Sequence, residues 1–219
     1  MDRTGKLALL LTMALLVLSG LKGHIGWADS STHRNYVRVG LGINIFTDDM
    51  DDVGYDDPGI GFDAAYGRYL TKYLVLEGGI HFFATSQDFS GSTGTAGAYD
   101  RDDMLDVTAI LATIKGEYPV GPVTLYAGAG IGGYYALLTS DIDTTYLGSF
   151  DTDDDDTVFG VHVVLGGYYN INERFFVGGQ GMYRWTEDID IHKIVATVPV
   201  QAKGNLEGYT IAVSAGFRF

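Results

Sequence analysis

The stretch Gly208-Tyr-Thr-Ile-Ala-Val-Ser-Ala-Gly-Phe-Arg-Phe219 alternates between two kinds of residue. The positions between its apolar residues are small or polar, which is the period of two of a β-strand with one apolar face. Aromatic rings at both ends of that face, with aliphatic groups between them, are typical of a strand that crosses an outer membrane. The apolar positions are Tyr209, Ile211, Val213, Ala215, Phe217 and Phe219.

The same alternation predicts seven earlier strands, although it is poor in Met104–Tyr118, where both faces are largely apolar and the inward face stays open. They are Tyr36–Phe46, Gly59–Tyr69, Tyr73–Thr85, Met104–Tyr118, Val123–Leu138, Val158–Tyr169 and Arg174–Asp188. Each supplies the roughly 9–11 residues that a tilted crossing of the bilayer needs. Because spanning strands must leave no backbone edge in lipid, we expect an all-β, eight-stranded antiparallel up-and-down transmembrane β-barrel. Side chains fill a barrel of eight strands, so no wide pore is expected.

The connections between the strands alternate between long and short. The short turns are Leu70–Lys72, Pro119–Pro122 and Asn170–Glu173, and the long connections are Thr47–Pro58, Ser86–Asp103, Thr139–Thr157 and Ile189–Leu206. The last of these also alternates in places, so we expect it to be partly strand. Outer-membrane barrels have short periplasmic turns and long extracellular loops, which predicts periplasmic termini and long loops at the cell surface.

A soluble, lipocalin-like barrel is the alternative for such strands, and it would point the apolar rows inward. Rows of five or more large side chains per strand would not fit an eight-stranded interior that glycine already lines. The 31 glycines suit a crowded lumen and the 15 tyrosines suit rings at the membrane interfaces. The composition therefore favours the membrane barrel.

The first 28 residues have the features of a secretory signal peptide. A basic start precedes the apolar run Leu7–Leu21, which is shorter than the roughly 20 residues of a membrane helix. Gly26-Trp27-Ala28 suits cleavage after Ala28. The sequence thus predicts a signal peptide at residues 1–28 and a barrel domain at residues 29–219.

Charge and cysteine content exclude other classes. The net charge of −14 excludes a typical nucleic-acid binder, whose footprint is basic. Cysteine is absent, so no disulfide stabilises the fold.

Three segments resemble the OmpA/OmpX-like outer-membrane β-barrel domain family, the small barrels of the porin family. They are Tyr73-Leu-Val-Leu-Glu-Gly-Gly79, Leu125-Tyr-Ala-Gly-Ala-Gly-Ile-Gly132 and Tyr183-Arg184-Trp185. The closing segment from Tyr209 to Phe219 is similar to the assembly signal that this family's insertion machinery reads. The resemblance implies an integral protein of the Gram-negative envelope, with lipid and lipopolysaccharide around it and the barrel-assembly machinery as a partner during insertion. We expect a monomer.

The faces expected to point inward carry groups of both charges. They are Arg38, Asp63, Glu77, His81, Lys115, His162, Gln180 and Arg184. Because buried charges require partners, we expect a stabilising network of salt bridges and hydrogen bonds. The resemblance implies a second reading, since family members can place a lumen acid between competing bases. Glu77, Lys115 and Arg184 lie on the corresponding strands and would form a gate.

Two long connections are rich in aspartate. The candidate calcium ligands are Asp48, Asp49, Asp51, Asp52, Asp56 and Asp57, and Asp151, Asp153, Asp154, Asp155 and Asp156. Their spacing is not that of an EF-hand loop, so a solvated, repelling surface is the favoured interpretation. Divalent-ion bridging to lipopolysaccharide phosphates is the intermediate possibility. No metal site or cofactor is predicted.

Catalysis would need a nucleophile beside a base. The histidines His33, His81, His162 and His192 form no compact pattern with serine, so no enzyme is predicted. The expected function is a non-catalytic role in envelope integrity or surface interaction through acidic extracellular loops. The alternative is a narrow, low-conductance channel gated by the lumen salt bridges.

Overall fold

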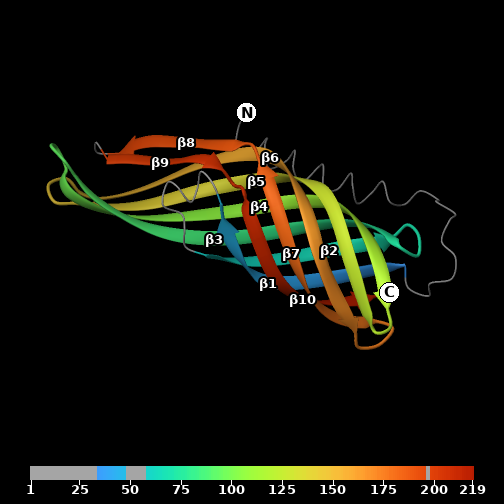
Figure 1. Cartoon of the computed structure of the whole chain (residues 1–219). Coiled ribbons are helices and arrows are strands. Elements are labelled where there is room, and N and C mark those ends of the chain that lie inside the picture. The colour runs from blue at the N-terminus through green and yellow to red at the C-terminus, as the bar shows by residue number, and fades with distance from the viewer. Residues whose placement is uncertain (1–33, 48–57, 196–197) are drawn as a thin grey trace.

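Eight strands form a closed barrel in the computed structural model, which describes residues 34–47, 58–195 and 198–219 (Figure 1). Around the ring the order is β1, β10, β7, β6, β5, β4, β3, β2, and every neighbouring pair is antiparallel. The strands are β1 (Asn35–Phe46), β2 (Gly59–Tyr69), β3 (Leu74–Thr93), β4 (Gly97–Val120), β5 (Val123–Thr144), β6 (Gly148–Asn170), β7 (Phe175–Thr186) and β10 (Gly208–Arg218). The predicted eight-stranded barrel is confirmed.

The N-terminal part of the chain and most of the first long connection are outside the described residues. The predicted signal peptide at 1–28, His33 and the aspartates of residues 48–57 therefore receive no structural account. No helix in the described part is both long and apolar enough to cross a membrane.

The apolar rows of the strands point away from the barrel axis. Leu41 on β1 is 62% exposed and Val213 on β10 is 70% exposed, whereas Asn44 and Thr210 on the same strands are buried. Exposed aliphatic groups around a buried polar interior suit lipid outside the wall. This arrangement is the reverse of a soluble barrel and excludes the lipocalin-like alternative.

Strands β3 to β6 continue well past the ring, and here two predictions were wrong. The expected loop Ser86–Asp103 is strand except for the turn at 94–96, and the expected loop Thr139–Thr157 is strand except for the turn at 145–147. Gly97 and Gly148 leave these turns with φ of 76° and 86°, a backbone conformation that favours glycine. We call residues 85–105 and 138–157 the extension.

The physical reason is that aspartate is depleted in strands but tolerated on a face that meets water. In the extension Asp141 and Asp143 are exposed, whereas Ser140 and Ile142, which alternate with them along the strand, are buried. The period of two therefore continues through segments whose composition resembles a loop.

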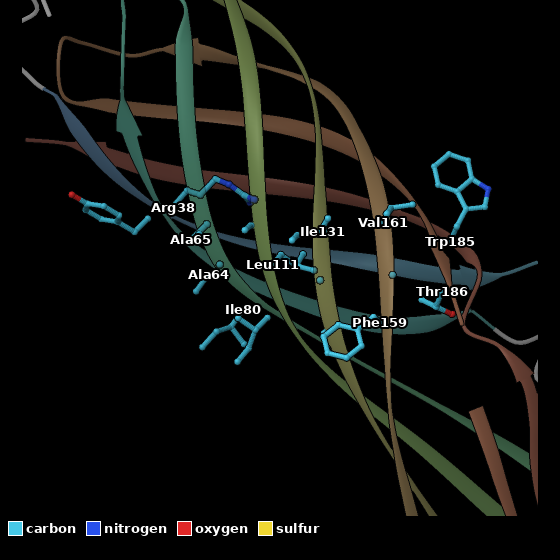
Figure 2. A pocket seen from close by; sticks show the side chains of 18 of the residues that line it. Arg38, Ala64, Ala65, Ile80, Leu111, Ile131, Phe159, Val161, Trp185 and Thr186 are labelled. Atoms are coloured by element: carbon cyan, nitrogen blue, oxygen red, sulfur yellow. The ribbon is translucent and has the colours of Figure 1, made fainter. Parts of the chain in front are cut away.

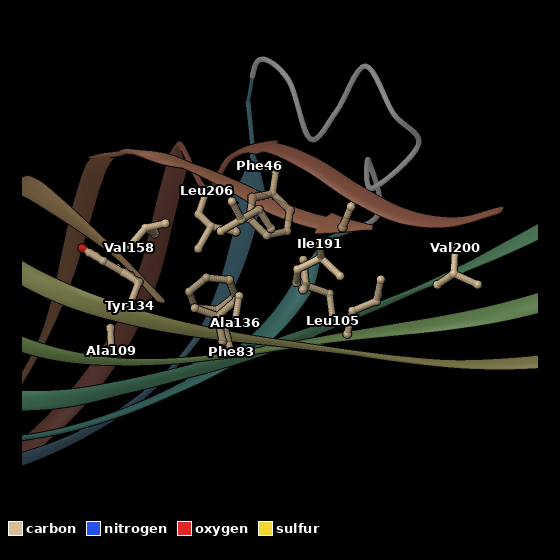
Figure 3. Packing of buried hydrophobic residues seen from close by; sticks show 14 of the residues in the cluster. Phe46, Phe83, Leu105, Ala109, Tyr134, Ala136, Val158, Ile191, Val200 and Leu206 are labelled. Carbon is tan, nitrogen blue, oxygen red and sulfur yellow. The ribbon is translucent and has the colours of Figure 1, made fainter. Parts of the chain in front are cut away.

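The fourth long connection, expected to be partly strand, is a separate two-stranded hairpin of β8 (Asp188–Val195) and β9 (Val198–Asn205). It lies along the extension (Figure 1). Its inner side chains Ile191, Val200 and Leu206 pack with Leu105 and Phe83 in one buried apolar cluster (Figure 3). Two layers of strands thus enclose an apolar core at one end of the barrel.

Candidate functional site

A compact ion cluster occupies the middle of the lumen. Glu77 on β3 lies between two cations, with Oε1 3.0 Å from Arg38 Nη2 and 2.7 Å from Lys115 Nζ. Arg38 also pairs with Asp63, and the Tyr36 hydroxyl donates a hydrogen bond to Glu77. Antiparallel registers place these inward positions on the neighbouring strands β1 to β4. Two cations and two carboxylates form a neutral set, which a low-dielectric interior requires.

Arg184 belongs to a different cluster, so the expected gate needs correction. Its Nε donates to Leu206 O at 2.6 Å and its Nη1 to Thr210 Oγ1 at 3.3 Å and to Asn44 Oδ1. The guanidinium also lies over the rings of Phe83 and Phe46, at 4.4 and 5.5 Å from their centroids. The base that shares Glu77 with Lys115 is Arg38.

The two lumen histidines and Gln180 fill the space beside the ion cluster. His162 Nε2 is 2.8 Å from Thr113 Oγ1, and Tyr126 donates a hydrogen bond to Gln180 Oε1 at 3.3 Å. His162, Thr113 and Gln180 line a cavity of about 20 Å³ together with His81 and Glu77. That volume suits a single water molecule, so side chains rather than an aqueous pore occupy this part of the lumen.

A larger hollow of about 900 Å³ runs over the outside of the wall (Figure 2). It is lined by exposed apolar side chains, among them Ile80, Ile131, Phe159 and Val161. A Cβ added at Gly78 would meet no atom within 4 Å, which shows how open the surface is there. Most of the hollow is the apolar, lipid-facing wall, and the few charged or hydroxyl residues in its lining include Arg38, Thr186 and Glu187.

Sequence reasoning missed several lumen residues. They are Tyr36, Asn44, Glu117 and Thr210, all buried. The Tyr69 hydroxyl donates to Glu117 Oε2 at 2.9 Å, and Thr210 donates to Asn44 Oδ1 at 3.0 Å. Strand parity could have identified them, because each lies an even number of residues from a predicted inward residue or between two outward ones.

The outward face of the extension carries a row of aspartates on adjacent strands. Asp88 is opposite Asp102, Asp102 is opposite Asp141, and Asp141 is opposite Asp151. Partial loss of water at the sheet surface, together with the charges of Asp88 and Asp141, raises the pKa of Asp102. Because like charges directly opposite each other repel, this row weakens the sheet that carries it.

The calcium candidates on β6 do not converge on one point. Residues Asp151 and Asp153–Asp156 are in a strand, so successive carboxylates point to opposite faces. Asp156 instead accepts a hydrogen bond from the backbone N–H of Asp190 at 3.1 Å. Within the described ranges, no group of three or more histidine, aspartate or glutamate residues could hold a metal ion.

Comparison with known proteins agrees with this architecture. The family model described as outer membrane protein beta-barrel domain matches residues 13–219. Neisserial surface protein A is similar in structure, with a TM-score of 0.52 and 14% identity, over 84% of this chain and 97% of that chain. This likeness shows the fold alone.

Two further solved structures are similar over a comparable share of the chain. Ail, the attachment invasion locus protein of Yersinia pestis, has a TM-score of 0.48 and 16% identity, over 86% of this chain and 100% of that chain. The outer membrane protein OprG of Pseudomonas aeruginosa has a TM-score of 0.47 and 12% identity, over 85% of this chain and 96% of that chain. No curated protein matches the sequence.

Proposed function

This chain belongs to the outer membrane protein β-barrel domain family, and on that premise we propose that it is a non-catalytic surface protein of the bacterial outer membrane that acts through its extension. The first and last strands meet at the rim away from the extension, where the Asn35 N–H donates to Phe219 O at 3.1 Å. In this proposal both termini are periplasmic and the extension is extracellular. The protein is a monomer in lipid and lipopolysaccharide, and the closing strand is the signal for the barrel-assembly machinery.

The observation that carries the proposal is the extension itself. Residues Thr85–Thr93 of β3 run past the last pairing with β2, and at about 3.3 Å per residue they reach roughly 30 Å further. One face of the extension is buried under the hairpin, and the other presents the aspartate row. A packed sheet of that length presents an ordered surface outside the membrane, which suits a role in envelope integrity or in surface interaction.

The experiment neutralises the aspartate row in the full-length protein on cells. The fourfold variant has Asp88, Asp102, Asp141 and Asp151 each changed to Asn. Its matched control has Ser86, Ser90, Ser92 and Thr139, which lie on the same outward face, each changed to Asn.

We expect the aspartate variant alone to bind less of a cationic protein probe and to change the sensitivity of the cells to bile salts. Folding of the barrel is checked for both variants by the shift in gel mobility between unheated and boiled samples, and surface display by cleavage of the extension by a protease added to intact cells. Equal probe binding and equal bile-salt sensitivity in wild type and both variants would refute the proposed role of the extension.

Catalysis is left out of the proposal because of where the histidines lie. His81 and His162 are 3% and 1% exposed inside the lumen, and His162 is bound to Thr113. His192 is exposed on β8. An unchanged mass spectrum of lipid A from cells that express the protein is the expected result, and a modified lipid A would contradict it.

A narrow channel is the second candidate, favoured by one feature. Glu77 is shared by Arg38 and Lys115, so an exchange of partners could open a water path through the lumen. Planar-bilayer recordings test this directly. Equal conductance of wild type and Glu77→Ala would remove the gate, and a wild-type protein that conducts no ions would remove the channel candidate.

A further inference from the structure

The hairpin closes one end of the lumen with apolar packing. Its side chains Ile189, Ile191, Val198 and Val200 are buried, as is Leu206, the residue that follows it. They form one cluster with inward residues of five barrel strands, Phe46 on β1, Phe83 on β3, Leu105 on β4, Leu138 on β5 and Val158 on β6 (Figure 3). Because β1 and β5 lie on opposite sides of the ring, the cluster spans the mouth of the barrel.

Hydrogen bonds tie the base of the hairpin to the end of β7. The Leu206 N–H donates to Thr186 Oγ1 at 2.7 Å, and Leu206 O accepts from Arg184 Nε at 2.6 Å. The Tyr183 hydroxyl donates to Glu207 Oε1 at 2.5 Å. Both the N–H and the C=O of Leu206, the residue that follows the hairpin, are thus hydrogen-bonded, and Leu206 lies where the polar lumen meets the apolar cluster.

We propose that β8–β9 is a plug that seals the lumen from the extracellular side, held in place by the burial of its apolar face. The plug separates the ion cluster of Arg38, Glu77 and Lys115 from water above the extension. This role is independent of what the aspartate row binds, and it means that any conducting state would need the hairpin to move.

The absence of cysteine makes the plug directly testable. Ala136 on β5 is fully buried in the cluster, and Ala98 on β4 is exposed. Each is changed to Cys in a separate chain, and the purified barrel in detergent micelles is treated with a membrane-impermeant maleimide. We expect the Cys at position 136 to react at least about a hundredfold more slowly than the Cys at position 98.

A matched pair of substitutions on β8 tests what holds the plug. Ile191 is 1% exposed and Ile194, on the same strand, is 66% exposed. Ile191→Ser removes buried apolar contacts and should speed labelling at position 136 by at least about tenfold, whereas Ile194→Ser should leave it unchanged. Leu206→Ala is a second variant of the buried kind and should act as Ile191→Ser does.

Gel mobility of unheated samples verifies that the barrel of each variant is closed. Slow labelling at position 136 that rises only with Ile191→Ser and Leu206→Ala supports the plug. Labelling at position 136 as fast as at position 98 in the otherwise unchanged chain would overturn the proposal. The proposal would also be overturned if neither buried substitution raised the rate in a closed barrel.

Discussion

The change Glu77→Gln tests whether the ion cluster holds the barrel together. Glu77 is the shared acceptor of Arg38, Lys115 and Tyr36 and is buried. Replacing it with a neutral group leaves two cations against the single carboxylate of Asp63. Because breaking a buried ion pair typically costs about 3–5 kcal/mol, we expect the free energy of unfolding to fall by about that amount.

Lys115→Met in the same chain should restore most of the loss. The remaining pair, Arg38 with Asp63, is again neutral. The free energy of unfolding is measured by urea titration in micelles for wild type, both single variants and the double variant, which gives the coupling energy. Glu187→Gln, an exposed acid at the end of β7, is the control and should change little.

Two results would refute the reasoning. One is a free energy of unfolding for Glu77→Gln within about 1 kcal/mol of the wild-type value, which is a smaller loss than a broken buried ion pair causes. The other is a double variant no more stable than Glu77→Gln alone, since the lost stability would then not come from uncompensated charge.

Two other predictions concern the barrel wall and the extension. Gly42→Ala would place a methyl group 2.3 Å from the backbone oxygen of Ile211 and should lower the free energy of unfolding by about 1–3 kcal/mol. The control Gly78→Ala, whose methyl group would meet no atom within 4 Å, should change that free energy little. Urea titration measures both, and equal effects would contradict the close approach of β1 and β10 at Gly42. Partial loss of water and the neighbouring carboxylates raise the pKa of Asp102 in the folded state, so folding favours its protonated form. The extension should therefore become more stable as pH falls from about 7 towards 4. Hydrogen exchange of the extension's backbone amides measures this stability. Asp102→Asn should be more stable than wild type at pH about 7, and its stability should depend less on pH. Faster amide exchange in the wild-type extension as pH falls, after correction for the intrinsic rate, or an equal pH dependence in the variant, would contradict the prediction.

The sequence predicted which strand residues face lipid and which face the lumen, because the membrane requires this alternation at each residue of a strand. Each residue of the closing strand faces either lipid or lumen, so the alternation of Tyr209 to Phe219 already specifies the wall, and closure follows from the need to pair every edge. The same parity placed Arg38 and Glu77 inward, where the structure has them, but it left the face of Lys115 open because both faces of Met104–Tyr118 are largely apolar.

The ion-pair partners of the lumen residues and the lengths of strands β3 to β6 were decided by the tertiary structure. The competing base for Glu77 is Arg38 rather than Arg184, because the offset between strands around the ring decides which inward residues share a level. The aspartate-rich segments are strands because the hairpin, far along the chain, covers their other face with Ile191 and Val200. A strand with one wet face becomes stable only when its second face is buried, and that burial is a property of the whole fold.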